Sequence, residues 1–86
     1  MDEALVRLLN ERARMACELG RIKKEMGVEV YQPEREKQVL AHVRDLASQG
    51  PLGSDAIAHL FERIIDEARR LERRLMHDDG QLPERD

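Results

Sequence analysis

Residues 2–26 of the chain read DEALVRLLNERARMACELGRIKKEM. Apolar side chains recur in this stretch every three or four residues, which is the spacing of a heptad seam along one face of a helix. The seam consists of Leu5, Leu8, Met15, Leu19, Ile22 and Met26, with Arg12 in one slot of the series. This pattern predicts one long helix from Asp2 to Met26, and Gly27 follows it as a helix stop.

Proline and glycine divide the rest of the chain into two further predicted helices. Pro33 suits the first position of a helix, where its missing N–H costs nothing, so the second helix is predicted from Pro33 to about Ser48. Gly50 and Pro51 then interrupt it. Ser54 is a suitable N-cap for a third helix. The apolar face of that helix comprises Ile57, Leu60, Phe61, Ile64, Ile65, Ala68, Leu71 and Leu75.

The composition limits the chain to one small domain and excludes several functions. Its 86 residues are predicted to form an all-α domain over residues 1–77 and a flexible tail over residues 78–86. A net charge of -3 and 2% aromatic residues argue against nucleic-acid binding, which needs basic surfaces or stacking rings. No stretch approaches the roughly 18 apolar residues of a membrane span, so a cytoplasmic protein is expected. Cys17 is alone, which leaves no disulfide framework and no multi-cysteine metal site.

The lengths of the predicted helices favour a homodimer. At about 1.5 Å per residue the first and third helices each extend for roughly 35 Å. Two such rods with one short helix between them do not enclose a core, and a sustained heptad seam needs a partner helix. We therefore expect two copies of the chain to share their helices. A monomeric three-helix bundle is the alternative.

Charged side chains interrupt the apolar faces and outline a candidate site. Arg12 and Lys23 are eleven residues apart, which at about 100° per residue places them on nearly the same face of the first helix. The small residues Ala16 and Gly20 lie between them and predict a pocket for an anion. On the third helix, Glu72 places a carboxyl group at the edge of the buried stripe.

Each of these charges also has an ordinary structural interpretation. An arginine in a seam can set dimer register, and a lysine at the margin of an apolar stripe can extend to water. Glu72 can pair with Arg69 or Arg73 on an exposed face. The histidines show no metal-ligand spacing and are interpreted as surface or boundary residues. They are His42, His59 and His77.

Several segments, in their order and spacing over about residues 2–75, resemble the all-helical AroQ-class chorismate mutases. They are LLNERA at 8–13, LGRIK at 19–23, YQPERE at 31–36, GPL at 50–52, FERII at 61–65 and RRLE at 69–72. The resemblance implies an intertwined helical homodimer with two active sites. It also implies the Claisen rearrangement of chorismate to prephenate, on the route to phenylalanine and tyrosine, with no metal or organic cofactor.

The family's site residues can be placed on this sequence by position. Arg12 would hold a substrate carboxylate, and Lys23 would bridge a carboxylate and the ether oxygen of chorismate. Arg35 would add positive charge from the start of the second helix. Glu36 would accept a hydrogen bond from the ring hydroxyl, assisted by the backbone near Gln32. This set suits a dianionic substrate whose breaking C–O bond leaves negative charge on the ether oxygen.

Glu72 falls where some relatives have a glutamine that donates to the ether oxygen, so the resemblance implies that Glu72 carries a proton when the enzyme acts. Ala68 stands where the family often has a serine that touches the substrate. The family's first helix usually begins some turns earlier and carries there an arginine that reaches into the partner's site. No residue here matches that arginine, which predicts either a longer natural chain or a weaker enzyme.

Other functions remain compatible with the same residues. Isochorismate pyruvate lyase shares the fold and the dianion pocket. A domain that binds chorismate or prephenate and regulates a partner enzyme is a second alternative, and a catalytically inactive dimerisation module is a third. A fused or associated enzyme of the aromatic pathway is a further expectation.

Overall fold

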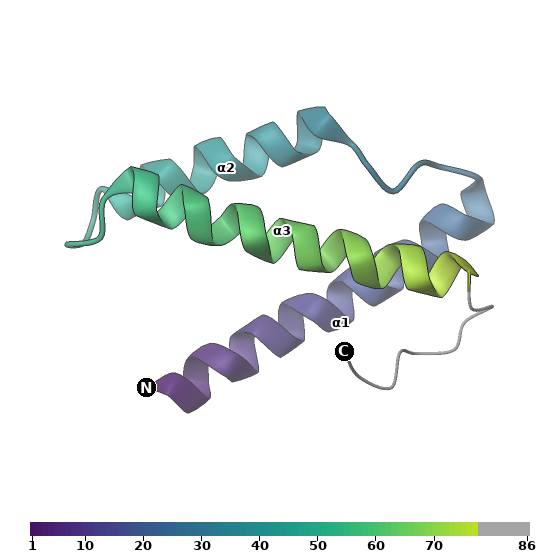
Figure 1. Cartoon of the computed structure of the whole chain (residues 1–86), viewed down its shortest axis with the longest axis horizontal. Coiled ribbons are helices and arrows are strands. Elements are labelled where there is room, and N and C mark those ends of the chain that lie inside the picture. Colours follow the sequence, from purple (N-terminus) through teal and green to yellow (C-terminus); the bar gives the residue numbers. More distant parts are fainter. Residues whose placement is uncertain (78–86) are drawn as a thin grey trace. The chain divides into compact units, whose positions relative to one another are not determined.

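Three helices form the computed structural model, which describes residues 1–77 (Figure 1). In chain order they are α1 (Asp2–Met26), α2 (Pro33–Ala47) and α3 (Ser54–His77), and no strand occurs within the described residues. The all-α prediction and the three predicted helices are confirmed. Helix α2 ends one residue before the predicted Ser48. The predicted tail over residues 78–86 lies outside the described part of the chain.

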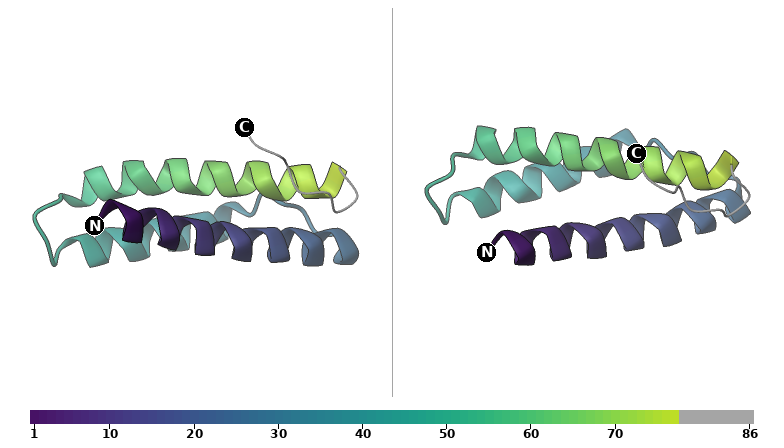
Figure 2. Two further views of the ribbon diagram at one scale, coloured as in Figure 1. Left: turned by 90° about the horizontal axis from the view of Figure 1, so that it is seen from below. Right: turned by 60° about the horizontal axis from the view of Figure 1, so that its bottom comes forward.

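The chain divides into two compact units. The first contains residues 1–30 and 68–77, and the second contains Tyr31–Glu67. Helix α3 contributes its first part to the second unit and its last turns to the first. The two views of Figure 2 show α3 as one unbroken helix.

The second unit is a helical hairpin made by α2 and the first part of α3. Its buried apolar residues are Val43 on α2 and Ala58 and Ile65 on α3. Arg44 donates a hydrogen bond to Asp55 Oδ1 at 2.7 Å and so ties the two helices together. Because this pair is exposed, its stabilising contribution is small and sensitive to salt.

The start of α3 corrects one detail of the sequence analysis. The amide of Ile57 donates to the carbonyl oxygen of Gly53 at 3.1 Å. Gly53 is therefore the residue that precedes the helix, and Ser54 occupies the first helical position instead of the predicted N-cap position.

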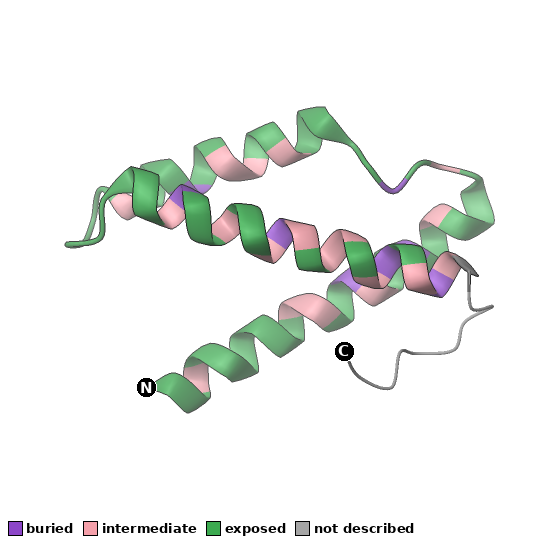
Figure 3. Cartoon of the chain, viewed as in Figure 1, coloured by how far each residue is buried: buried purple, intermediate pink, exposed green. Residues whose placement is uncertain are grey.

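In the first unit, the C-terminal half of α1 lies beside the last turns of α3 (Figures 1 and 3). Ala16 and Gly20 are the buried residues of α1. From the other segments of this unit, Val30 and Leu75 are the buried apolar residues. Small residues on α1 allow the two helix backbones to approach closely, which brings the polar side chains at this contact into hydrogen-bonding range.

Most of the predicted seam on α1 is open to solvent in the single chain. Figure 3 shows that exposed residues dominate the N-terminal half of this helix. The exposed seam side chains are Leu5 (58%), Leu8 (57%), Met15 (66%), Leu19 (49%), Ile22 (49%) and Met26 (69%). The homodimer in which a partner helix covers this row stays a prediction, and the monomeric three-helix bundle stays its alternative.

Membrane-spanning helices and metal-binding clusters are both absent from residues 1–77. Within residues 1–77, no helix is long and apolar enough to cross a membrane. The same part of the chain contains no cluster of three or more histidine, cysteine, aspartate or glutamate residues able to hold a metal ion. His42 and His59 are exposed, as their interpretation as surface residues requires.

Candidate functional site

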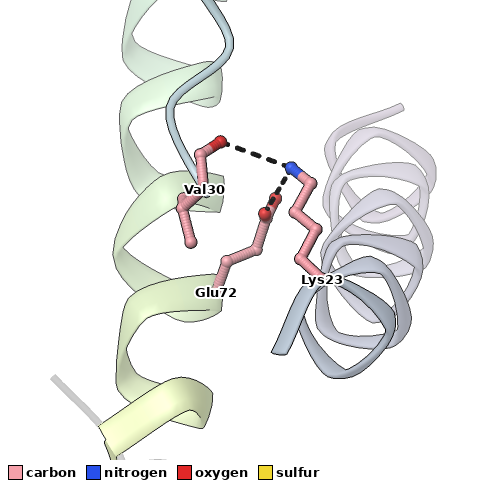
Figure 4. A network of polar contacts seen from close by, with 3 residues as sticks. All are labelled: Lys23, Val30 and Glu72. Atoms are coloured by element: carbon pink, nitrogen blue, oxygen red, sulfur yellow. Dashed lines mark hydrogen bonds and ion pairs between the residues drawn. The ribbon is translucent and has the colours of Figure 1, made fainter. Parts of the chain in front are cut away.

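A lysine–glutamate pair lies at the contact between α1 and the last turns of α3 (Figure 4). Lys23 Nζ donates a hydrogen bond to Glu72 Oε1 at 2.8 Å and a second one to the carbonyl oxygen of Val30 at 3.3 Å. The Lys23 side chain is 18% exposed and that of Glu72 is 8% exposed. The pair is therefore largely withdrawn from water, where an ion pair is stronger and where removing one partner is costly.

The end of α1 positions the backbone part of this site. Gly27 adopts the left-handed conformation, with φ 70° and ψ 29°. Its amide bonds to the carbonyl of Lys24 at 3.3 Å, and the amide of Val28 bonds to the carbonyl of Lys23 at 2.9 Å. These two bonds form a Schellman motif, which turns the chain back over the last turn of α1. The turn brings the carbonyl of Val30 to the Lys23 ammonium group.

The contact between Gly20 and Glu72 corrects the predicted pocket. The gap left by the missing side chain of Gly20 is not empty, because a Cβ atom placed there would lie 3.1 Å from the Cα of Glu72. The small residue thus serves close packing of α1 against α3. The space that the sequence predicted for an anion is therefore filled by α3 at this position.

The structure also decides between the alternatives for two of the charged residues. Glu72 is buried and pairs with Lys23, so an exposed pair with Arg69 or Arg73 is the wrong interpretation. Lys23 does not extend to water as a marginal lysine would, because its ammonium group is held by Glu72 and by the carbonyl of Val30.

The remaining site residues of the first unit are Arg12 and Ala68, and both are half-buried. Arg12 precedes Lys23 by about three turns of α1, which corresponds to roughly 16 Å along the helix axis. Ala68 lies one turn before Glu72 on α3 and has no polar side-chain group. Together with the central pair, they place four of the predicted site residues in this unit.

The other three predicted site residues belong to the second unit and lie around the start of α2. Gln32 precedes the helix, and its carbonyl oxygen accepts the amide of Glu36 at 3.1 Å. Gln32 and Arg35 are exposed, whereas Glu36 is half-buried. Pro33 at the first helical position fixes the backbone of this turn.

Sequence reasoning missed two features of this site. The carbonyl oxygen of Val30 is a backbone acceptor, and a pattern of side chains in the sequence does not predict such a group. The role of Gly20 left a signal, because glycine inside a helix is unfavourable by about 1 kcal/mol relative to alanine and needs a compensating reason. That reason is the approach of Glu72, which a single sequence without contacts cannot reveal.

The site can hold an anion by donated hydrogen bonds. An ammonium group has three N–H donors, and within the described residues Glu72 and Val30 take two of those of Lys23. The two hydrogen bonds to Glu72 and Val30 fix the Lys23 side chain and so also fix the direction of its third N–H group. A preorganised cation of this kind stabilises negative charge that develops on a bound oxygen atom.

The fold is similar to that of a solved structure, a chorismate mutase (form II) from Thermus thermophilus. The TM-score is 0.80 and the sequence identity 36%, over 85% of this chain and 82% of that one. A family model described as "Chorismate mutase type II" matches residues 1–73. The chain therefore belongs to the type II chorismate mutase family.

Two relatives show how such a domain occurs in other proteins. The chain is 41% identical over 75 residues to a "Bifunctional chorismate mutase/prephenate dehydratase" of Neisseria gonorrhoeae, covering 87% of this chain and 20% of the relative. It is 23% identical over 78 residues to a "Chorismate mutase" of Methanocaldococcus jannaschii, covering 91% of this chain and 79% of the relative. The chain thus spans about a fifth of the length of the bifunctional relative.

Proposed function

We propose that residues 1–77 form a domain that rearranges chorismate to prephenate. The observation that carries this proposal is the largely buried pair of Lys23 and Glu72, 2.8 Å apart, inside the segment that matches the family model. The reaction is intramolecular, so the protein has to hold the reactive conformer and stabilise charge in the transition state. A fixed ammonium group beside a carboxyl group on a neighbouring helix supplies both requirements.

Lys23 is the main catalytic residue in this proposal. As the C–O bond of chorismate breaks, negative charge develops on the ether oxygen, and the ammonium group of Lys23 donates to that oxygen and to a substrate carboxylate. The hydrogen bond to the carbonyl of Val30 holds the ammonium group in place before substrate arrives. A donor oriented in advance costs no reorganisation during the reaction, and one such donor contributes about 3–4 kcal/mol.

Glu72 acts as the second donor to the ether oxygen. A carboxylate only accepts hydrogen bonds, so Glu72 performs this role in its protonated form. The neutral acid no longer competes with the substrate for the charge of Lys23. Both groups then face the same oxygen atom, from α1 and from α3.

The other site residues bind the periphery of the substrate. Arg12 pairs with a carboxylate, and Arg35 adds positive charge from the start of α2. Glu36 accepts from the ring hydroxyl, beside the backbone of Gln32. Ala68 offers no side-chain hydrogen bond where the resemblance implies a serine, which weakens substrate binding by the value of one hydrogen bond, about 1 kcal/mol.

The assembly and the context of the domain are part of the same proposal. The exposed seam of α1 is covered by a second copy of the chain, giving a homodimer. The bifunctional relatives support a fused or associated prephenate dehydratase as a partner. Such a biosynthetic enzyme acts in the cytoplasm and needs no cofactor for this rearrangement.

Parallel incubations with chorismate and with isochorismate test the proposal. Formation of prephenate from chorismate supports the mutase. Formation of salicylate and pyruvate from isochorismate would instead identify a lyase. Tight binding of a transition-state analogue without turnover of either compound would identify a regulatory domain. Absence of any binding would identify a dimerisation module.

A further inference from the structure

We infer that Gly20 is a positioning residue for Glu72, an inference that rests on the proposed function and deepens it. Gly20 touches no reacting atom in this scheme. Its lack of a side chain lets α3 come close enough to α1 for the carboxyl group of Glu72 to reach the ammonium group of Lys23.

The distances around Gly20 identify Glu72 as the residue that it accommodates. A Cβ atom at position 20 would lie 3.1 Å from the Cα, 3.3 Å from the Cβ and 3.3 Å from the Cγ of Glu72. The closest of these atoms belongs to the backbone, so a side-chain rotation cannot relieve the contact. Any added methyl group therefore displaces this turn of α3 by a few tenths of an ångström.

This displacement acts directly on the catalytic pair. Lys23 follows Gly20 by three residues, so the two lie on one face of α1. The hydrogen bond from Lys23 Nζ to Glu72 Oε1 is 2.8 Å long and spans the same contact between the helices. The other bond of Lys23, to the carbonyl oxygen of Val30 at 3.3 Å, joins two residues outside α3. A shift of α3 therefore changes the position of Glu72 relative to the Lys23 ammonium group.

The effect of Gly20→Ala on activity and on folding, taken together, separates a positioning role from a merely structural one. Alanine has a higher helix propensity than glycine, so Gly20→Ala favours α1 itself. If glycine had no specific role at position 20, Gly20→Ala would raise the stability of the chain and leave its activity unchanged. A positioning residue loses activity while the chain stays folded.

The first experiment compares Gly20→Ala with Gly50→Ala in the full chain. A Cβ atom at Gly50 would have no other atom within 4 Å, so Gly50→Ala controls for the chemical change. We expect kcat for chorismate to fall at least about tenfold in Gly20→Ala, with KM changed much less, because transition-state contacts tolerate little displacement. Circular dichroism should show full helix content. An unchanged kcat, or a chain that fails to fold, contradicts the inference.

A second readout tests whether the effect passes through Glu72. In a Glu72→Ala background the Cα and Cβ contacts remain, but the carboxyl group is gone. We expect Gly20→Ala to lower kcat no further in that background, because residues that act as a unit are not additive. An additional loss of the same size as in the natural chain would show a merely structural role and would overturn the inference.

A third readout needs no substrate. The coupling between Lys23 and Glu72 in unfolding can be measured by a double-mutant cycle with Lys23→Met and Glu72→Gln. We expect this coupling to fall by more than half when Gly20 is alanine. An unchanged coupling contradicts the inference even if the chain proves inactive toward chorismate, so a failure of the proposed function and a failure of this inference are distinguishable.

Discussion

Lys23 Nζ and Glu72 Oε1 lie 2.8 Å apart although 49 residues separate them in the sequence. Their side chains are 18% and 8% exposed. The pair therefore joins the end of α1 to the end of α3 through two groups that have given up most of their hydration. Loss of either partner leaves the other partly buried without its counter-charge, which costs stability as well as chemistry.

Replacement of Lys23 by methionine should abolish most of the activity. We expect kcat/KM for chorismate to fall by a factor of about 100–1000, the usual effect of removing one preorganised donor. The free energy of unfolding should fall by about 1–3 kcal/mol, because Glu72 loses its partner. Lys24→Met is the control, since Lys24 is the neighbouring lysine and is exposed. Retention of wild-type activity by Lys23→Met would remove Lys23 from the mechanism.

Replacement of Glu72 by glutamine should preserve the activity, whereas replacement by alanine should not. Glutamine donates a hydrogen bond through its side-chain amide, and alanine has no polar side-chain group. We expect kcat for chorismate to stay close to the natural value in Glu72→Gln and to fall by a factor of about 100 in Glu72→Ala. Glu62→Ala, on an exposed position of the same helix, should keep the natural kcat. Equal losses in Glu72→Gln and Glu72→Ala would exclude the donor role.

The Arg44–Asp55 pair should make the stability of the second unit dependent on pH and salt. The hydrogen bond and the charge of Arg44 lower the pKa of Asp55 below its ordinary value of 3.8. A lowered folded-state pKa stabilises the folded chain above the unfolded-state pKa, and this stabilisation disappears as pH falls through the folded value. The change Asp55→Asn should therefore lower the melting temperature slightly near pH 7 and have progressively less effect below about pH 4.

Added salt provides a second measurement on the same pair. Because both side chains are exposed, 48% for Arg44 and 84% for Asp55, screening weakens their attraction. We expect the difference between the natural chain and Asp55→Asn near pH 7 to shrink as salt is added. A difference that is equal at all pH values and salt concentrations would mean that Asp55 acts through something other than its charge.

Most of the fold could be predicted because its determinants are local. The helix boundaries follow from residues whose effect on the backbone is independent of context, such as Gly27 with its positive φ and Pro33 at a first helical position. The start of α3 was less well predicted. Gly53 and Ser54 are both acceptable residues before a helix, and only the hydrogen bond from Ile57 to Gly53 distinguishes them.

The sequence indicated Lys23 and Glu72 as candidate residues but not the contact between them. Helical periodicity placed Lys23 on the same face as Arg12, and the apolar stripe of α3 placed Glu72 at a buried edge. Neither pattern specifies which turn of α3 meets which turn of α1. That alignment depends on the close approach at Gly20, and so the space predicted there for a ligand is occupied by α3.

The exposed seam of α1 should be the contact between two copies of the chain. We expect the natural protein to sediment with twice the 10.0 kDa mass of the chain. Leu8→Glu should convert it to a monomer, because a charge in the middle of a heptad seam cannot be buried without a partner. Val6→Glu is the matched control, since Val6 is 55% exposed, close to the 57% of Leu8, but is not part of the seam. Analytical ultracentrifugation distinguishes the two outcomes. A natural chain that is monomeric at all concentrations, or a dimer that persists in Leu8→Glu, would assign this row of apolar side chains to a different partner.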